Sequence, residues 1–214
     1  MIKYLCFLLI FILPVSCLAG ISVVGTRFFI DDLTKPINIK IINDNENDYL
    51  VKTSINSDGF IISPPLFILQ RNESNIITII PDEKLKGNED KVYPLTIYSI
   101  PKSELNNNEN RVSLAVRSHF KLVYQHGLPS EKDFNEIKLI RSKNNKWLLI
   151  NKSDFSFVVF LSKKPAYKPR ATKLLAPNEE IAVNECSTEY TCSLWLTILD
   201  RKENILKTIN LAHD

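Results

Sequence analysis

The chain contains little glycine and few of the residues that catalytic and metal sites need. Its 214 residues include only 5 Gly, 11 Pro, 4 Cys and 3 His. That composition excludes collagen-like and low-complexity classes. No HExxH, GxSxG or glycine-rich phosphate loop occurs, and His119, His126 and His213 belong to no such motif. We therefore expect no enzyme, no metal site, no cofactor and no small-molecule substrate.

The chain also lacks a strong excess of either charge. Lys+Arg 27 against Asp+Glu 24 gives a formal net charge of +3, with no clustered basic stripe along the sequence. A nucleic-acid-binding surface needs a concentrated positive patch that attracts phosphates. Nucleic acid is therefore not an expected partner.

One long apolar run is present, and it lies at the N-terminus. Lys3 provides a positive start, residues 5–13 are apolar, and Cys17-Leu18-Ala19 offers small residues for cleavage after the alanine. The run is short for a membrane span. We expect residues 1–19 to be a secretory signal peptide. Cys17 leaves a lipoprotein site as an alternative, although Pro14 stands where such a site normally has leucine.

Two cysteines remain after removal of the signal peptide. Cys186 and Cys192 flank Ser187–Thr191 and lie between two apolar runs. In an oxidising compartment this pattern predicts a disulfide that closes a hairpin, with two unpaired thiols as the alternative. A zinc site is disfavoured, because no histidine lies near and only two thiolates are offered.

Short runs with a period of two dominate the rest of the chain, and helical patterns are nearly absent. The first series is Ser22–Ile30, Pro36–Ile42, Asp48–Ile55, Ile76–Ile80, Val92–Ile100 and Arg111–Tyr124. The second series is Glu136–Arg141, Lys146–Ile150, Phe155–Leu161, Lys173–Leu175, Glu180–Cys186, Cys192–Leu199 and Ile205–Leu211. Regular short strands separated by turns predict an all-β fold of antiparallel sandwiches. We expect two β-sandwich domains, residues 20–126 and 130–214, joined by a linker at 127–129.

The run at residues 111–124 is long for a strand and has two different faces. Val112, Leu114 and Val116 alternate with the small residues Ser113 and Ala115, and Lys121 lies on the opposite face. Taken alone, the apolar alternation favours packing in the protein's own core, and Lys121 reads as a solvated lysine.

A series of short motifs resembles the periplasmic chaperones of chaperone–usher pilus assembly. In chain order they are Ser22–Arg27, Ile39–Asn43, Tyr49–Val51, Ser63–Phe67, Ile97–Lys102, Lys121–Tyr124, Leu149–Asn151 and Leu175–Pro177. Each motif is short, but their order and spacing cover nearly the whole mature chain.

The resemblance implies two immunoglobulin-like domains in an angled, L-shaped arrangement and a periplasmic, non-enzymatic chaperone. Such a chaperone donates an edge strand to pilin subunits, caps them and delivers them to an outer-membrane usher. On this chain the resemblance assigns the groove-filling side chains to Val112, Leu114 and Val116. It assigns the anchor for the pilin's C-terminal carboxylate to Arg27 and Lys121. It leaves open a dimer in which the free protein covers its own strand.

One departure from the family concerns the joint between the domains. The family often has a buried acid–arginine–acid cluster there, and the corresponding residues are Asp90, Gln125 and Asp200. Glutamine cannot neutralise two acids, so we expect a weaker link or another cation such as Arg201.

An alternative function is an exported two-domain β-sandwich that serves as an adhesin or a structural pilus component. A pilin would lack the basic pair and would carry an N-terminal extension of alternating apolar residues.

Overall fold

The architecture is almost entirely β-strand. The structure is a computed structural model that describes residues 20–103, 113–165, 171–186 and 191–213. The described helical pieces are a 3-10 turn, η1 (Glu83–Leu85), and a short helix, α2 (Glu131–Phe134). No helix in the described part of the chain has the length and apolar character needed to cross a membrane.

The first sandwich is built from two sheets. One sheet has the strand order β1 (Ser22–Val23), β3 (Ile37–Ile42), β7 (Ser74–Pro81), β5 (Phe60–Ser63). The other has the order β2 (Arg27–Ile30), β9 (Val116–Tyr124), β8 (Lys91–Pro101), β4 (Tyr49–Ile55), β6 (Leu66–Leu69). Their facing side chains form one core that contains Ile39, Val51, Ile77 and Leu95.

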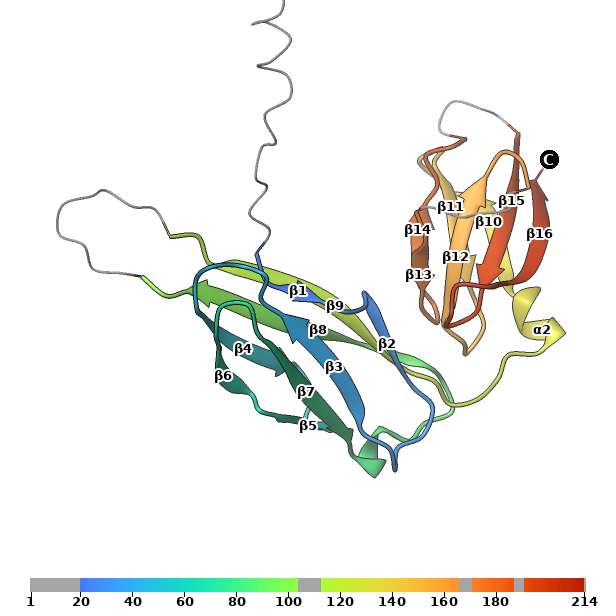
Figure 1. Cartoon of the computed structure of the whole chain (residues 1–214). Helices are drawn as coiled ribbons and strands as arrows, with labels where there is room; N and C mark the ends of the chain where they lie inside the picture. Colours follow the sequence, from blue (N-terminus) through green and yellow to red (C-terminus); the bar gives the residue numbers. More distant parts are fainter. Residues whose placement is uncertain (1–19, 104–112, 166–170, 187–190, 214) are drawn as a thin grey trace, which may run out of the picture.

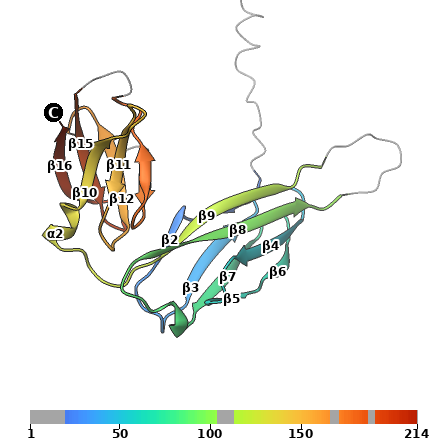
Figure 2. The ribbon, with the colours of Figure 1, turned by 180° about the vertical axis from the view of Figure 1, so that it is seen from behind.

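The second sandwich is smaller and follows the same plan. One sheet has the order β10 (Ile137–Arg141), β11 (Trp147–Asn151), β14 (Glu180–Ala182). The other has the order β13 (Lys173–Leu175), β12 (Phe157–Ser162), β15 (Cys192–Leu199), β16 (Ile205–His213). Figures 1 and 2 show the two sandwiches set at an angle to each other. The prediction of an all-β protein with two sandwiches is therefore confirmed.

The two sandwiches meet through a small apolar cluster. Val123 of β9 is buried with Val158, Leu174 and Leu199 of the second sandwich. Phe29 of β2 packs against the same cluster. Alternation along β2 and β9 thus sends one face into the first core and the other toward the second sandwich.

The N-terminal run predicted as one strand, Ser22–Ile30, is two strands in different sheets. β1 pairs with β3, whereas β2 pairs in parallel with β9. Gly25 lies between them with φ at +113°, and a Cβ there would lie 2.9 Å from the Phe28 ring. Glycine therefore lets the chain change sheets at this point.

The strand predicted at residues 111–124 begins later, at Val116. Its ladder with β8 starts at the pair Ser99–Val116. In that register Pro101 would lie opposite Leu114, and proline has no backbone N–H to donate. Residues 113–115 are described but belong to no strand, and residues 111 and 112 lie outside the described residues.

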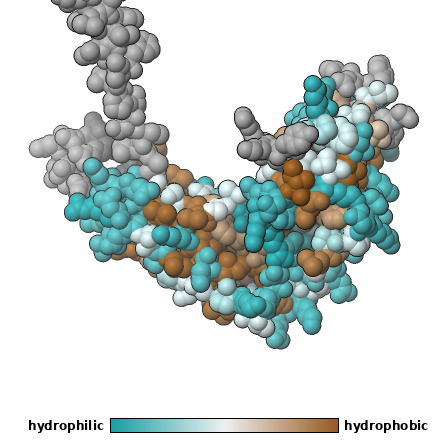
Figure 3. Space-filling model, turned by 45° about the vertical axis from the view of Figure 1, so that its right-hand side comes forward, coloured by the Kyte–Doolittle hydropathy of each residue, from teal (hydrophilic) through white to brown (hydrophobic). Residues whose placement is uncertain are grey.

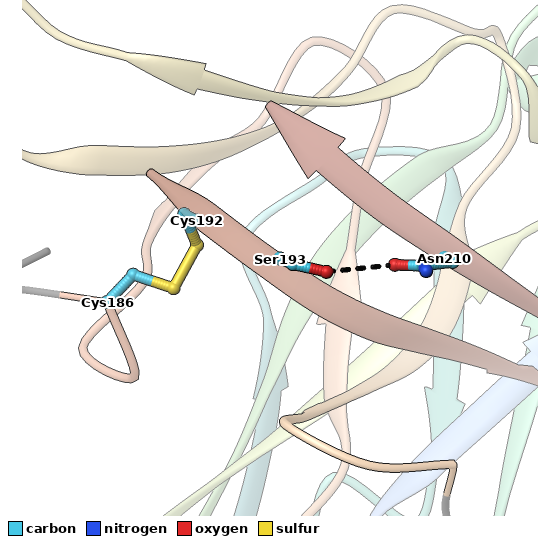
Figure 4. The surroundings of a disulfide bond; sticks show 4 residues. All are labelled: Cys186, Cys192, Ser193 and Asn210. Atoms are coloured by element: carbon cyan, nitrogen blue, oxygen red, sulfur yellow. Dashed lines mark hydrogen bonds between the residues drawn. A yellow bond between two sulfur atoms is a disulfide. The ribbon is translucent and has the colours of Figure 1, made fainter. Parts of the chain in front are cut away.

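The predicted disulfide is confirmed, because Cys186 and Cys192 are bonded (Figure 4). Both cysteines are buried in the core of the second sandwich. Next to Cys192, Ser193 Oγ donates to Asn210 Oδ1 at 3.2 Å across β15 and β16. The bridge therefore joins the start of β15 to the segment that follows β14.

Replacing both cysteines with serine should lower the free energy of unfolding of the second sandwich by about 2 kcal/mol, because the bridge closes only a short loop. Urea denaturation followed through the fluorescence of buried Trp147 measures the change. The wild type, unfolded under reducing conditions and followed by the same fluorescence, should show the same loss of stability. A double-serine variant as stable as the oxidised wild type would contradict the prediction.

Candidate functional site

Arg27 and Lys121 are brought together by the pairing of β2 with β9. The two strands run parallel, and Arg27 lies opposite Lys121 in the register. Phe28 and Ile30, the neighbouring residues of β2, contribute to the first core, so Arg27 faces out of it. Figure 3 shows a hollow between the sandwiches. Arg27 lines a hollow there together with residues of the second sandwich such as Val158. Two basic groups that sequence reasoning paired are therefore adjacent in space.

The guanidinium of Arg27 is held by the second sandwich. Its Nη2 donates to the backbone oxygen of Thr172 at 2.8 Å and to Thr172 Oγ1 at 2.9 Å. Its Nη1 lies 3.8 Å from Glu203 Oε1. With 15% of its side chain exposed, Arg27 is partly buried but still reachable from the hollow.

Lys121 is exposed and has no side-chain partner among the described residues. It lines a groove of about 510 Å³ together with Arg27, Thr172 and Glu180. The ammonium group of Lys121 has no fixed partner and can therefore bind an anion. The guanidinium of Arg27 beside it adds planar N–H donors.

Residues 116–120 of β9 have a free edge. β8 covers one side of β9 along its whole length, but β2 covers the other side only at residues 121–124. Within the described chain no other strand pairs with that side. Backbone N–H and C=O groups on an open edge can pair with a strand from another molecule.

The apolar side chains next to this edge are not in the protein's own core. Leu114 is 73% exposed and Val116 is 48% exposed, whereas Leu122 further along the same strand is fully buried. Packing in the protein's own core, which alternation alone favoured, is therefore wrong for Leu114 and Val116. Val112 lies outside the described residues.

The other face of β9 carries basic side chains. Arg117 lies over the Tyr98 ring at 5.2 Å, and His119 Nδ1 lies 3.3 Å from Thr96 Oγ1. Together with Lys121 these residues alternate with the side chains that face the core. The apolar side chains and the basic side chains thus lie on opposite faces of one strand.

The buried carboxylate at the domain joint has histidine and backbone donors as partners. Asp90 Oδ1 accepts from the backbone N–H of His126 at 3.0 Å and lies 2.9 Å from His126 Nδ1. Asp90 Oδ2 accepts from the backbone N–H of Ser156 at 2.7 Å. The ring of His126 also stacks on Phe155, with centroids 4.4 Å apart. Asp90 therefore joins the first sandwich to its own C-terminal residue His126 and to the second sandwich.

Arg201, the cation expected at the joint, forms a second link, but its partners are Gln125 and Asp31 rather than the two acids Asp90 and Asp200. Its Nε donates to Gln125 Oε1 and its Nη1 to Asp31 Oδ2, both at 2.5 Å. The hydrogen bond from Arg201 lowers the pKa of the Asp31 carboxyl. Asp200 instead bonds within its own turn, where Asn204 lowers its pKa. The acid–arginine–acid arrangement is thus replaced by two separate links.

Sequence reasoning missed Thr172, Glu203 and the structural role of His126. Thr172 directly precedes β13 and Glu203 lies in the turn between β15 and β16, both far along the chain from Arg27, and nothing in their local sequence marks them. Among the described residues no group of three His, Cys, Asp or Glu could hold a metal ion.

A family model for pili and flagellar-assembly chaperones, the PapD N-terminal domain, matches residues 20–128. The protein belongs to this family of pilus-assembly chaperones. The chaperone protein FocC of Escherichia coli is 27% identical over 191 residues, which cover 83% of each chain. The chaperone protein FimC of Escherichia coli O6:H1 is 28% identical over 156 residues, or 66% of this chain and 64% of FimC.

Solved structures share the fold at low sequence identity. A Salmonella enterica structure of the SafA pilin in complex with the SafB chaperone aligns with a TM-score of 0.69 and 14% identity. That alignment covers 93% of this chain and 99% of the matched chain. The periplasmic chaperone SfaE aligns with a TM-score of 0.65 and 18% identity, over 91% of this chain and all of SfaE.

Changing Gln125 to arginine should weaken the joint, because it removes the acceptor for Arg201 and places two cations together. We expect a loss of about 0.5–1 kcal/mol in the free energy of unfolding after solvent screening. Gln125→Glu is the matched control, since it keeps an acceptor and adds an opposite charge. Urea denaturation measures stability and small-angle scattering measures domain orientation. If Gln125→Arg and Gln125→Glu show the same stability and the same domain orientation, the hydrogen bond between Gln125 and Arg201 does not stabilise the joint.

Proposed function

We propose that this protein is a non-enzymatic periplasmic chaperone that lends its β9 edge to pilin subunits and passes them to an outer-membrane usher. The observation that carries the proposal is the open edge of β9 at residues 116–120, flanked by exposed apolar side chains and ending at a basic pair. The signal peptide expected at residues 1–19 fits export to the periplasm.

In the proposed complex the backbone of β9 pairs with a strand of the client. Main-chain hydrogen bonds supply affinity that does not depend on the client's sequence, and alternate side chains of the donated strand fill pockets in the client. Val112, Leu114 and Val116 are the proposed groove-filling residues. Burying each such side chain contributes roughly 1.5–3 kcal/mol before the costs of ordering.

Arg27 and Lys121 are proposed to hold the client's C-terminal carboxylate. An arginine fork and a lysine point charge can grip one carboxylate together. A fixed end sets the register, and a slip of one residue would turn every client side chain to the wrong face. Residues 20–126 and 130–214 serve as the two domains in this proposal, with the anchor on the first.

Co-expression with a candidate pilin tests the anchor. The wild type should give a soluble one-to-one complex, and Lys121→Glu should abolish it because the client's carboxylate would meet a like charge. Lys138→Glu, an exposed change on β10 of the second sandwich, is the matched control and should keep the complex. A pilin that is equally soluble without this protein would overturn the proposal.

Leu114→Asp and Val116→Asp test the lent edge separately from the anchor. Both side chains are exposed, so the free energy of unfolding should change by less than about 0.5 kcal/mol. Binding of the pilin should weaken by at least about tenfold, since a charge would enter an apolar groove. Ala115→Asp changes the exposed residue that alternates with Leu114 and Val116 in the sequence, and it should bind as the wild type does. Equal losses for all three variants would point to a general charge effect instead.

A further inference from the structure

The hollow beside Arg27 contains an acidic side chain that the proposed function does not use. Glu203 Oε1 lies 3.8 Å from Arg27 Nη1, while Thr172 binds Nη2. Arg27 and Glu203 also line one hollow of about 450 Å³ between the sandwiches. The anchor arginine therefore already has a carboxylate beside it when no client is bound.

The turn that carries Glu203 is fixed by its own hydrogen bonds. Asp200 Oδ1 accepts from the backbone N–H groups of Lys202 and Asn204, each at 2.8 Å. The backbone N–H of Glu203 donates to the Asp200 carbonyl at 3.1 Å. Glu203 itself has φ at +65°, which is uncommon for a residue other than glycine. Since the turn does not depend on the ion pair, it can release Arg27 without rearranging.

We propose that Glu203 is an internal substitute for the client's terminal carboxylate. It lies within ion-pair distance of Nη1 of Arg27 in the free protein and is displaced when the client's carboxylate arrives. Thr172 keeps Nη2 throughout, so the guanidinium stays in place. This inference rests on the proposed function, because it requires that Arg27 binds the end of the client.

The ion pair between Arg27 and Glu203 is weak enough for a client carboxylate to replace Glu203. The side chain of Glu203 is 68% exposed, and an exposed ion pair changes an equilibrium by no more than about fivefold. A client that also pairs with Lys121 and β9 easily outcompetes it. Glu179 and Glu180 line the groove beside Lys121, but within the described chain neither forms an ion pair with it. The anchor is thus occupied on its arginine side and open on its lysine side.

The test uses a labelled synthetic peptide of alternating valine and threonine with a free C-terminal carboxylate, and the same peptide ending in an amide. Glu203→Gln should bind the carboxylate peptide about two- to fivefold tighter than the full-length wild type. The gain should shrink at high salt and be absent for the amide. Glu185→Gln, an exposed change that lines neither hollow, should give no gain.

The outcomes separate the inference from the proposed function. If the wild type prefers the carboxylate peptide and Arg27→Ala loses that preference, the result supports the proposed role of Arg27 in binding the client's terminal carboxylate. A Glu203→Gln variant equal to wild type then overturns the inference alone, and so does an equal gain in Glu185→Gln. A wild type that does not distinguish the two peptides overturns the anchor and the inference together. Glu203→Asp, whose shorter side chain keeps the charge but reaches less far, should give a smaller gain than Glu203→Gln.

Discussion

The parallel pairing of β2 with β9 is the constraint on which the rest of the structure depends. It spans only Arg27–Ile30 against Lys121–Tyr124, so it ends where the basic pair lies. Beyond that point β9 continues with one side open. The same four residue pairs send Phe29 and Val123 toward the second sandwich. One short ladder thus places the proposed anchor, leaves the rest of the β9 edge open and supplies the apolar contact between the domains.

The joint between the sandwiches shows how a buried carboxyl group is held without an arginine. Asp90 has no exposed side-chain surface, and a carboxylate in that position needs several donors to offset its lost hydration. His126, at the end of the first domain, and the backbone of Ser156 in the second sandwich provide them. Satisfying Asp90 therefore requires the two domains to be in place. Hydrogen bonds to Asp90, rather than an arginine, therefore help to fix how the two domains are oriented.

Much of the fold could be predicted from sequence because period-two alternation survives wherever one face of a strand is buried. The strand break at Gly25 could not be predicted from sequence, since it depends on the left-handed backbone of Gly25 and on the nearby ring of Phe28. β5 and β6 were missed because proline and short length obscure their alternation. The pairing of Arg27 with Lys121 came from resemblance to a family. The contacts of Arg27 with Thr172 and Glu203 depend on how two domains meet, which no local pattern records.

An open edge with apolar side chains is a hazard for a free protein, because identical edges can pair with each other. The exposed part of β9 is short, and its ladder with β8 ends near Pro101. Its other face presents Arg117 and Lys121, whose like charges oppose the approach of a second copy. A client that brings a terminal carboxylate meets attraction where a second copy meets repulsion. The cations therefore favour a strand that ends in a carboxylate over a second copy of the same edge.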